Sequence, residues 1–277
     1  ADEAVLQKLV ATQGVGIFFV AKDLVRTPMQ EVIAPVRRAL FPGLSRLSPG
    51  EPGFHRAYFG TVAGLFMIVA PMGLGVALVA DEAVPLLLGA AWSEAVVPMQ
   101  IFGLQMAITV LGQAAIAGAM ASGNTRMWFN RNLVITPIRF GLLIAGALYG
   151  GVNGAVAALF VAGMISTGLN IAMANRVVGS SHWDHVRPCW RTWSAAALLV
   201  CTLGGADLML PAASTLGLLE LGVRLTVQVV LGAAVYTLAH LGLWLAAGRP
   251  HGPEARLLEL LARRRPGAVL RRQHTGR

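Results

Sequence analysis

Residues 57–79 read AYFGTVAGLFMIVAPMGLGVALV and contain no charged side chain. An α-helix of about 20 predominantly apolar residues crosses the hydrocarbon core of a bilayer, so this stretch predicts a transmembrane helix. Further apolar runs of comparable length lie on either side of it, at residues 14–44, 96–121, 133–149, 152–174, 193–210 and 221–247. The sequence therefore predicts an all-α integral membrane protein, a polytopic bundle of about seven transmembrane helices.

The composition of the whole chain excludes other classes of protein. Of its 277 residues, 56% are hydrophobic and 13% are charged, and the mean hydropathy is +0.65. Soluble domains carry about 25% charged residues, so this chain has too few charged residues to form the surface of a water-soluble protein. Its high hydrophobic content also excludes a disordered protein. The apolar runs also lack the alternation of about ten-residue strands that is typical of a membrane β-barrel. Two cysteines, Cys189 and Cys201, indicate neither a disulfide framework nor a metal motif.

The basic residues predict an orientation in the membrane. The net charge is +9, but its carriers lie between apolar runs and in the tail, which argues against a nucleic-acid partner. They occupy the linkers after the first, third and fifth runs and the C-terminal segment: Arg46, Arg56, Arg126, Arg131, Arg176, Arg187, Arg191 and the tail arginines from Arg249 to Arg277. The alternate linkers contain no basic residue and carry Asp81, Glu82, Glu94 and Asp207. By the positive-inside rule, the tail faces the cytoplasm.

The first apolar run carries an unusual set of polar side chains. At 100° per residue, Lys22, Asp23, Arg26 and Gln30 lie within a sector of about 100°, together with Arg37. An ionised side chain at mid-membrane costs about 2.5–3.5 kcal/mol, so these groups are expected to face a watery cavity or one another. In the alternative, Lys22 and Asp23 partly neutralise their neighbours, while Arg37 and Arg38 reach the headgroups.

Two more arginines fall inside apolar runs. Arg139, beside Pro137, has no acidic neighbour in sequence and is the better candidate for a functional role. Arg224 lies close to Glu220, so an ion pair explains it.

No sequence motif indicates an enzyme, a cofactor or a metal site. Nucleotide-binding, hydrolase and zinc-protease signatures are missing from the sequence. His182 and His185 are spaced to share a metal, but a basic interfacial loop anchored by tryptophans is the favoured interpretation.

The two ends of the chain carry further expectations. The first residue is not methionine and no signal peptide follows, so we expect the interior of a longer protein. Residues 253–272 alternate leucines with arginines and predict a basic amphipathic helix on anionic membrane lipids.

The order of motifs resembles that of polysaccharide-biosynthesis flippases, the O-antigen and exopolysaccharide repeat-unit translocases of the multidrug/oligosaccharidyl-lipid/polysaccharide exporter superfamily. Residues 16–28, GIFFVAKDLVRTP, and residues 38–47, RALFPGLSRL, are similar to that family's "G-x-[YF]-x-x-A … P … P-x-x-R-x-[LF]-F-P-x-[LF]-S-R-L" segment. The motif residues to which the resemblance assigns a structural role are Pro28, Pro35, Phe41, Pro42 and Ser45. Residues 71–92 and the GGVNGAVA turn at 150–157 also resemble the family pattern.

The resemblance implies a MATE-like transporter of fourteen helices, of which this chain is the C-terminal lobe. Residues 1–180 then run from the end of the seventh span to the twelfth, residues 181–248 form two additional helices, and residues 249–277 form a basic cytoplasmic tail. The implied function is flipping of undecaprenyl-pyrophosphate-linked oligosaccharide across the bacterial inner membrane, without ATP hydrolysis. Implied partners are this lipid-linked oligosaccharide and, as candidates, a polysaccharide polymerase and the export machinery.

Pyrophosphate chemistry then singles out particular side chains. Arginines lining a cavity offer bidentate, charge-assisted hydrogen bonds to phosphate, so Lys22, Arg26, Gln30 and Arg139 are the candidate headgroup contacts. The main alternative is a cation-coupled multidrug antiporter of the same superfamily, in which Asp23 and Glu31 carry the coupling ion. A membrane enzyme acting on lipid-linked sugars would need a large outer loop, and the predicted outer loops are about fifteen residues at most. A purely structural membrane subunit is the remaining alternative.

Overall fold

The computed structural model describes residues 12–44, 46–47, 51–116, 125–250 and 252–255. Over these residues every regular element is a helix, and none is a strand. The all-α fold class predicted from the sequence is therefore confirmed. The long helices are α2 (Thr12–Leu44), α3 (Pro52–Leu78), α5 (Val96–Thr109), α7 (Thr125–Val178), α9 (Trp190–Met209) and α10 (Leu218–Ala246).

Short helices connect or extend the long ones. They are α4 (Ala80–Leu88), η1 (Ala90–Ala95), η2 (Val110–Gly112), α8 (Trp183–Val186), η3 (Arg187–Cys189) and η4 (Ala213–Thr215). The segment from 81 to 95, expected as an outer linker, is therefore largely helical. Only Gly89, with φ of 91°, interrupts it between α4 and η1.

Five helical stretches in the described chain are long and apolar enough to cross a membrane. They are Pro52–Leu78, Ala90–Ile116, Arg126–Val178, Trp183–Met209 and Leu218–Ala246. The third is twice the length of a span because it folds back on itself. Helix α2 is not among the five stretches because of its charged residues. With α2 added, and with the third stretch counted as two rods, the helices match the seven apolar runs predicted from the sequence.

The fold-back of α7 lies at Gly150 and Gly151. Gly151 has a φ of +57°, which an L side chain rarely adopts and glycine tolerates. Beside the turn, a Cβ atom added to Gly146 would overlap the backbone of Gly154, so the two rods touch backbone to backbone. We call residues 125–149 the first arm of α7 and residues 152–178 its second arm.

The first arm begins earlier than the sequence predicts. It starts at Thr125 and not near residue 133, so Arg126 and Arg131 lie within a helix and not in a linker. No proline or glycine interrupts residues 125–132, and the Arg131 guanidinium finds polar partners inside the protein. Hydropathy alone places the start of this helix too late, because it scores each arginine as if its side chain had no polar partner in the protein.

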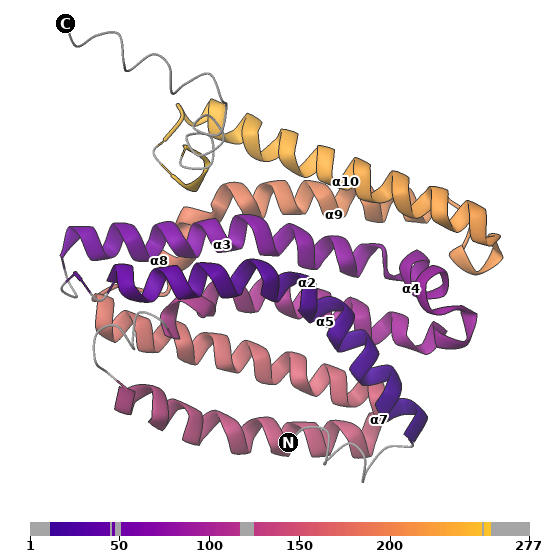
Figure 1. Ribbon diagram of the computed structural model, residues 1–277, viewed down its shortest axis with the longest axis horizontal. Coiled ribbons are helices and arrows are strands. Elements are labelled where there is room, and N and C mark those ends of the chain that lie inside the picture. The colour runs from indigo at the N-terminus through magenta and orange to yellow at the C-terminus, as the bar shows by residue number, and fades with distance from the viewer. Residues whose placement is uncertain (1–11, 45, 48–50, 117–124, 251, 256–277) are drawn as a thin grey trace, which may run out of the picture.

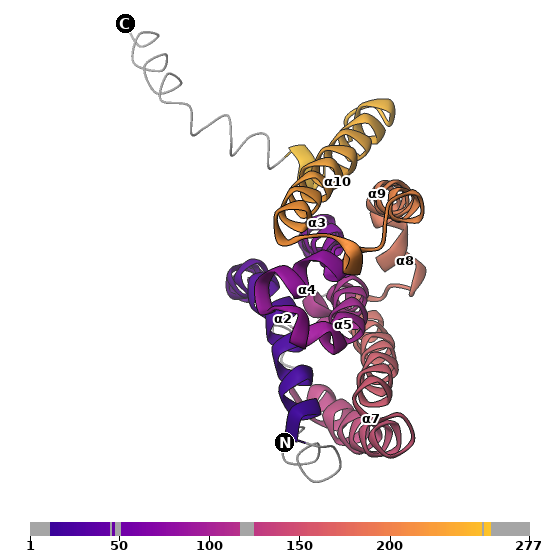
Figure 2. The same cartoon turned by 90° about the vertical axis from the view of Figure 1, so that its right-hand side faces the viewer.

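The rods form a stack whose order Figure 2 shows end-on. Helices α9 and α10 lie at one edge of the stack, next to α3. Helices α2 and α5 occupy the middle, and the two arms of α7 form the other edge. In Figure 1 the rods alternate in direction, and α2 bends part-way along, as expected of a helix with internal prolines. One end of the bundle, the basic end, therefore carries Arg46, Arg56, Arg126, Arg176 and Arg187, and the opposite, acidic end carries Asp81, Glu82, Glu94, Asp207 and Glu220.

The core lies where α2, α3 and α5 meet. Phe18, Met29, Phe54 and Phe66 are fully buried there. A Cβ atom added to Gly73 of α3 would lie 2.6 Å from the carbonyl oxygen of Gly103 in α5. These two helices thus approach as closely as their backbones allow, which is how membrane helices gain packing contacts.

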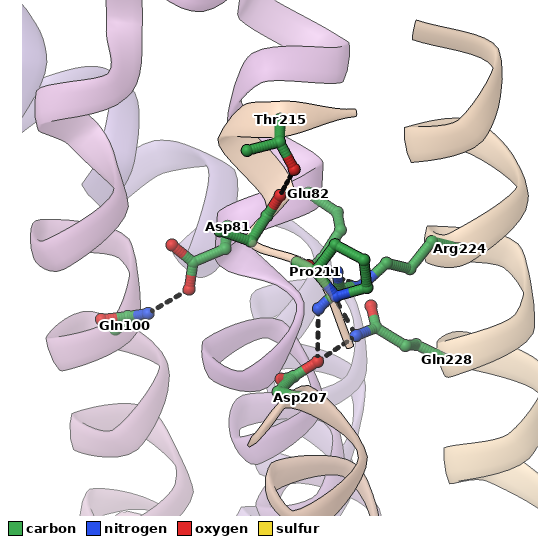
Figure 3. Close-up of polar contacts among 9 residues, drawn as sticks. Asp81, Glu82, Gln100, Asp207, Pro211, Thr215, Arg224 and Gln228 are labelled. Atoms are coloured by element: carbon green, nitrogen blue, oxygen red, sulfur yellow. Dashed lines mark hydrogen bonds and ion pairs between the residues drawn. The ribbon is translucent and has the colours of Figure 1, made fainter. Parts of the chain in front are cut away.

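A buried ion-pair cluster ties α10 to α4 and α9 at the acidic end (Figure 3). Arg224 Nε lies 2.8 Å from Glu82 Oε1, and Arg224 Nη2 lies 2.8 Å from Asp207 Oδ1. Gln228 Nε2 also donates to Asp207, over 2.7 Å. Burial raises the pKa of the Glu82 carboxyl, and the charge of Arg224 acts in the opposite direction.

The pairing of Arg224 with Glu220 expected from the sequence is wrong. The Glu220 carboxylate instead accepts the backbone N–H of Gly217, over 3.0 Å, at the start of α10. Helical spacing places Glu220 one turn from Arg224, but the acidic groups that reach Arg224 come from two other helices. The ion pair is present with different partners.

At the basic end the histidines pair with protein groups. His185 is buried and shares a 3.0 Å hydrogen bond with Tyr58, whereas His182 is exposed. His240 and Arg191 both contact Glu254 Oε1, at 3.2 and 2.7 Å. No group of three or more His, Cys, Asp or Glu residues suited to a metal occurs within the described ranges. Most of the predicted tail helix, from residue 256, lies outside them.

Candidate functional site

A polar cavity of about 370 Å³ opens between α2, α5 and both arms of α7. Helix α2 contributes Lys22 and Arg26, one turn apart, and the first arm contributes Arg131 and Arg139, two turns apart. Helix α5 supplies Gln105, and the second arm supplies Ser166. Rods that are far apart in sequence thus bring four cationic side chains to one hollow.

The charged side chains that line this cavity are all positive. No aspartate or glutamate lines it within the part of the chain that the structure describes. Lys22 Nζ lies 5.0 Å from the centroid of the Phe19 ring and 5.8 Å from that of Phe18, so aromatic faces help to hold the ammonium group. A hollow of this kind attracts anions and repels cations.

Hydrogen bonds across the cavity hold its walls together. Arg131 Nη1 donates to Asn132 Oδ1 over 2.8 Å. Arg131 Nη2 reaches the second arm, where it contacts the Ser166 hydroxyl and, at 3.3 Å, the Ser166 carbonyl oxygen. Gln105 Nε2 donates to the Leu159 carbonyl oxygen over 2.8 Å and so joins α5 to the same arm.

Two of the four cations lie near the middle of their helices. Arg26 is two residues from the midpoint of α2, and Arg139 is two residues from the midpoint of the first arm. At about 1.5 Å per residue, each lies within ~3 Å of the middle of its rod. Charges at such depth are costly against lipid, and the cavity is where they avoid that cost.

Three of the four candidate headgroup contacts expected from the sequence line this cavity. They are Lys22, Arg26 and Arg139. Gln30, one turn beyond Arg26, is half-buried but does not line it. The candidate ion-coupling residues Asp23 and Glu31 are exposed and also lie off the cavity.

The structural motif residues lie along the rest of α2. Pro35 is exposed, and Pro28 lines a separate, apolar cavity of about 400 Å³ between α2, α3, α9 and α10. The side chains of Phe41 and Pro42, and the whole of Ser45, lie outside the described part of the structure.

Arg131 is the charged site residue that sequence reasoning missed, and the polar residues Gln105 and Ser166 were not predicted either. Arg131 was assigned to a cytoplasmic linker because it precedes the apolar run. The available signal was periodic: residues 131, 135 and 139 are spaced four apart, so all three fall on one helical face if the helix starts at 125.

Comparison with known proteins shows which family part of this chain resembles. Residues 1–97, which include Lys22 and Arg26, match the profile of a family described as polysaccharide biosynthesis protein. Over 187 residues the chain is 22% identical to the lipopolysaccharide biosynthesis protein WzxC of Escherichia coli strain K12. Both matches indicate a similarity to polysaccharide-biosynthesis proteins of the flippase type. The resemblance noted in the sequence is thereby confirmed.

The extent of the match to this flippase family is partial. The alignment covers 67% of this chain and 38% of WzxC, so the chain spans well under half of its relative's length. Arg131 and Arg139 lie beyond the residues that match the family profile. No solved structure matches the chain significantly.

Proposed function

We propose that the protein flips a lipid-linked oligosaccharide across the bacterial inner membrane, and that the cavity holds the phosphate groups of its undecaprenyl-pyrophosphate anchor. The observation that carries the proposal is the convergence of Lys22, Arg26, Arg131 and Arg139 on one deep cavity whose described lining contains no carboxylate. Similarity to a polysaccharide-biosynthesis protein family and to WzxC supports the class of cargo.

The chemistry of the cavity suits a pyrophosphate. A pyrophosphate carries at least two negative charges, and its oxygens accept paired N–H groups from guanidinium. Moving it through hydrocarbon alone would cost far more than binding could return. Cations in the cavity replace the water that the phosphates lose, whereas the apolar polyprenyl part needs no such compensation.

The proposed mechanism is transport by alternating access, with no enzymatic step. Arg26 and Lys22 on α2 face Arg131 and Arg139 on α7, so a bound anion would be held between separate rods. A relative movement of these rods would pass the anion from one membrane face to the other. The basic end of the bundle is proposed to face the cytoplasm.

The cavity does not favour the cation-coupled antiporter. Its cationic lining would repel a cationic drug, and Asp23 and Glu31 lie outside it. Asp23→Asn and Glu31→Gln are therefore expected to leave polysaccharide export close to normal.

The test compares arginine variants in the full-length protein that carries this chain. Arg26→Ala and Arg139→Ala should each abolish export at normal protein abundance, because losing one partner of a desolvated charge contact costs on the order of 2–5 kcal/mol, or well over tenfold in affinity. Lysine at either position should restore export only in part, since it keeps the charge but loses the two-pronged geometry. Arg56→Ala, at an exposed arginine outside the cavity, is the matched control. Full export from both cavity variants would remove the proposed site.

A further inference from the structure

A second basic hollow lies on the other side of the α7 hairpin. It has a volume of about 510 Å³ and is lined by α7 alone, by both arms and by neither α2 nor α5. Arg126, Arg131 and Arg176 supply its charge. Of all the residues around it, only Arg131 also lines the central cavity. We call this hollow the hairpin groove.

Helical geometry separates the hairpin groove from the cavity. At 100° per residue, groove residues 127, 130 and 134 fall on one side of Arg131, and cavity residues 132, 136 and 139 fall on the other. On the second arm, groove residues 169, 172, 173 and 176 likewise fall to one side of Ser166. Because Arg131 bonds Ser166 across the seam between the arms, this contact divides the two hollows.

The groove is amphipathic along its length. Arg126 is the second residue of α7 and Arg176 lies two residues before its end, so both stand at the basic end of the hairpin. Asn130 and Arg131 follow Arg126 by one to two turns, and beyond them the groove walls are apolar, formed by Val134, Leu169 and Met173. Nearby on the first arm, Phe129 and Leu133 are 62% and 65% exposed. Charge at the rim and apolar walls toward mid-membrane match the shape of a lipid with its headgroup at the interface.

The charge at the rim selects the kind of lipid. Among the described residues, no aspartate or glutamate lines the groove. Arg126 and Arg176 are exposed and come from opposite arms, so a phosphate between them would be contacted from two sides. Basic pockets between transmembrane helices near a membrane face are suited to anionic lipid headgroups. A zwitterionic headgroup would bring a cation toward these arginines.

We propose that the hairpin groove binds an anionic membrane phospholipid, with its phosphate on Arg126 and Arg176 and its acyl chains along the methionine and leucine walls. The bound lipid is a constituent of the surrounding leaflet and not the transported molecule, because the groove and the cavity lie on opposite sides of the Arg131–Ser166 contact. The lipid bridges the two arms at the end opposite their glycine contact, and so holds the hairpin in place from the membrane side.

The experiment is native mass spectrometry of the full-length protein in neutral detergent, with phosphatidylglycerol and phosphatidylcholine of identical acyl chains as probes. The wild type is expected to retain phosphatidylglycerol about tenfold better than phosphatidylcholine, because both lipids offer a phosphate but only phosphatidylcholine brings a cationic choline toward the arginines. Arg126→Gln combined with Arg176→Gln should remove this preference. Arg187→Gln, an exposed arginine at the same end but outside the groove, should keep it.

Three results would overturn the proposal. One is no preference for phosphatidylglycerol in the wild type, and another is an equal loss in the Arg187→Gln control, which would indicate general attraction to the basic end. The third is displacement of the bound phospholipid by undecaprenyl pyrophosphate, which would make the groove a station for the cargo. Thermal unfolding in phosphatidylcholine checks that each variant folds, and the two single variants repeat the test if the double variant does not.

Discussion

Glu82 and Arg224 are 142 positions apart in sequence, yet their side chains form a 2.8 Å ion pair in which the carboxyl is 1% exposed. The pair joins α4, which follows α3, to α10, the last long helix, and Asp207 and Gln228 complete it (Figure 3). It attaches the α9–α10 pair to the rest of the bundle by polar contacts at the acidic end.

The Glu82–Arg224 pair predicts a large stability effect. Glu82→Ala leaves the largely buried guanidinium with Asp207 and the Pro211 carbonyl oxygen, and removing one partner of a buried pair typically costs about 3–5 kcal/mol. We expect a marked drop in thermal unfolding temperature in detergent. The double variant Glu82→Ala, Arg224→Ala should be less unstable than the sum of the two single variants, because neither charge is then left unpaired. Simple additivity would show that the pair contributes little.

Two glycines in one helix make a matched packing test. A Cβ atom at Gly73 would lie 2.6 Å from the Gly103 carbonyl oxygen and 2.9 Å from the Ala107 nitrogen, so Gly73→Ala should force α3 from α5 and cost about 1–3 kcal/mol. Gly75 has nothing within 4 Å of such a Cβ atom. Gly75→Ala should therefore be neutral or stabilise the helix by up to about 1 kcal/mol. The measurement is thermal unfolding of the two variants side by side; equal effects would contradict the close helix contact.

Variants of Arg131 and of Ser166 test whether Arg131 acts through its charge or by joining the two arms of α7. Arg131→Ala removes a cation from the cavity as well as the bond to Ser166, and we expect it to lower polysaccharide export by at least tenfold at normal abundance. Ser166→Ala leaves the cation and the carbonyl acceptor in place, so export should fall by no more than about twofold. If both variants were equally impaired, Arg131 would act by joining the arms and not by presenting its charge.

The proposed orientation is testable with single cysteines. Ser93 in η1 is exposed at the acidic end and Ser181 is exposed at the basic end, whereas the native Cys189 is buried and thus a poor reporter. In a full-length background with Cys189 and Cys201 replaced by alanine, Ser93→Cys should react with a membrane-impermeant maleimide in spheroplasts. Ser181→Cys should react only after the membrane is permeabilised. The reverse pattern would place the tail outside and contradict the proposed direction of transport.

Local features of the fold could be read from the sequence. The apolar runs predicted the long helices because a segment of about 20 apolar residues forms a helix in the bilayer whatever the rest of the chain contains. The turn at Gly150 and Gly151 followed from the cluster of glycines at that point. Charged side chains inside apolar runs were also visible in the sequence, and they singled out Lys22 and Arg26 on α2 and Arg139 on α7.

The sequence by itself thus determined the membrane class, the rods, and which apolar helices carry charge, since each depends on residues near one another in the chain. Only the tertiary structure decided which charges meet. It placed Arg131 inside a helix because Ser166, 35 residues away, accepts its hydrogen bonds, and it paired Arg224 with Glu82 instead of the nearby Glu220. The energy of a buried charge depends on its partners across the helix interface, and hydropathy summed along one segment contains no term for them.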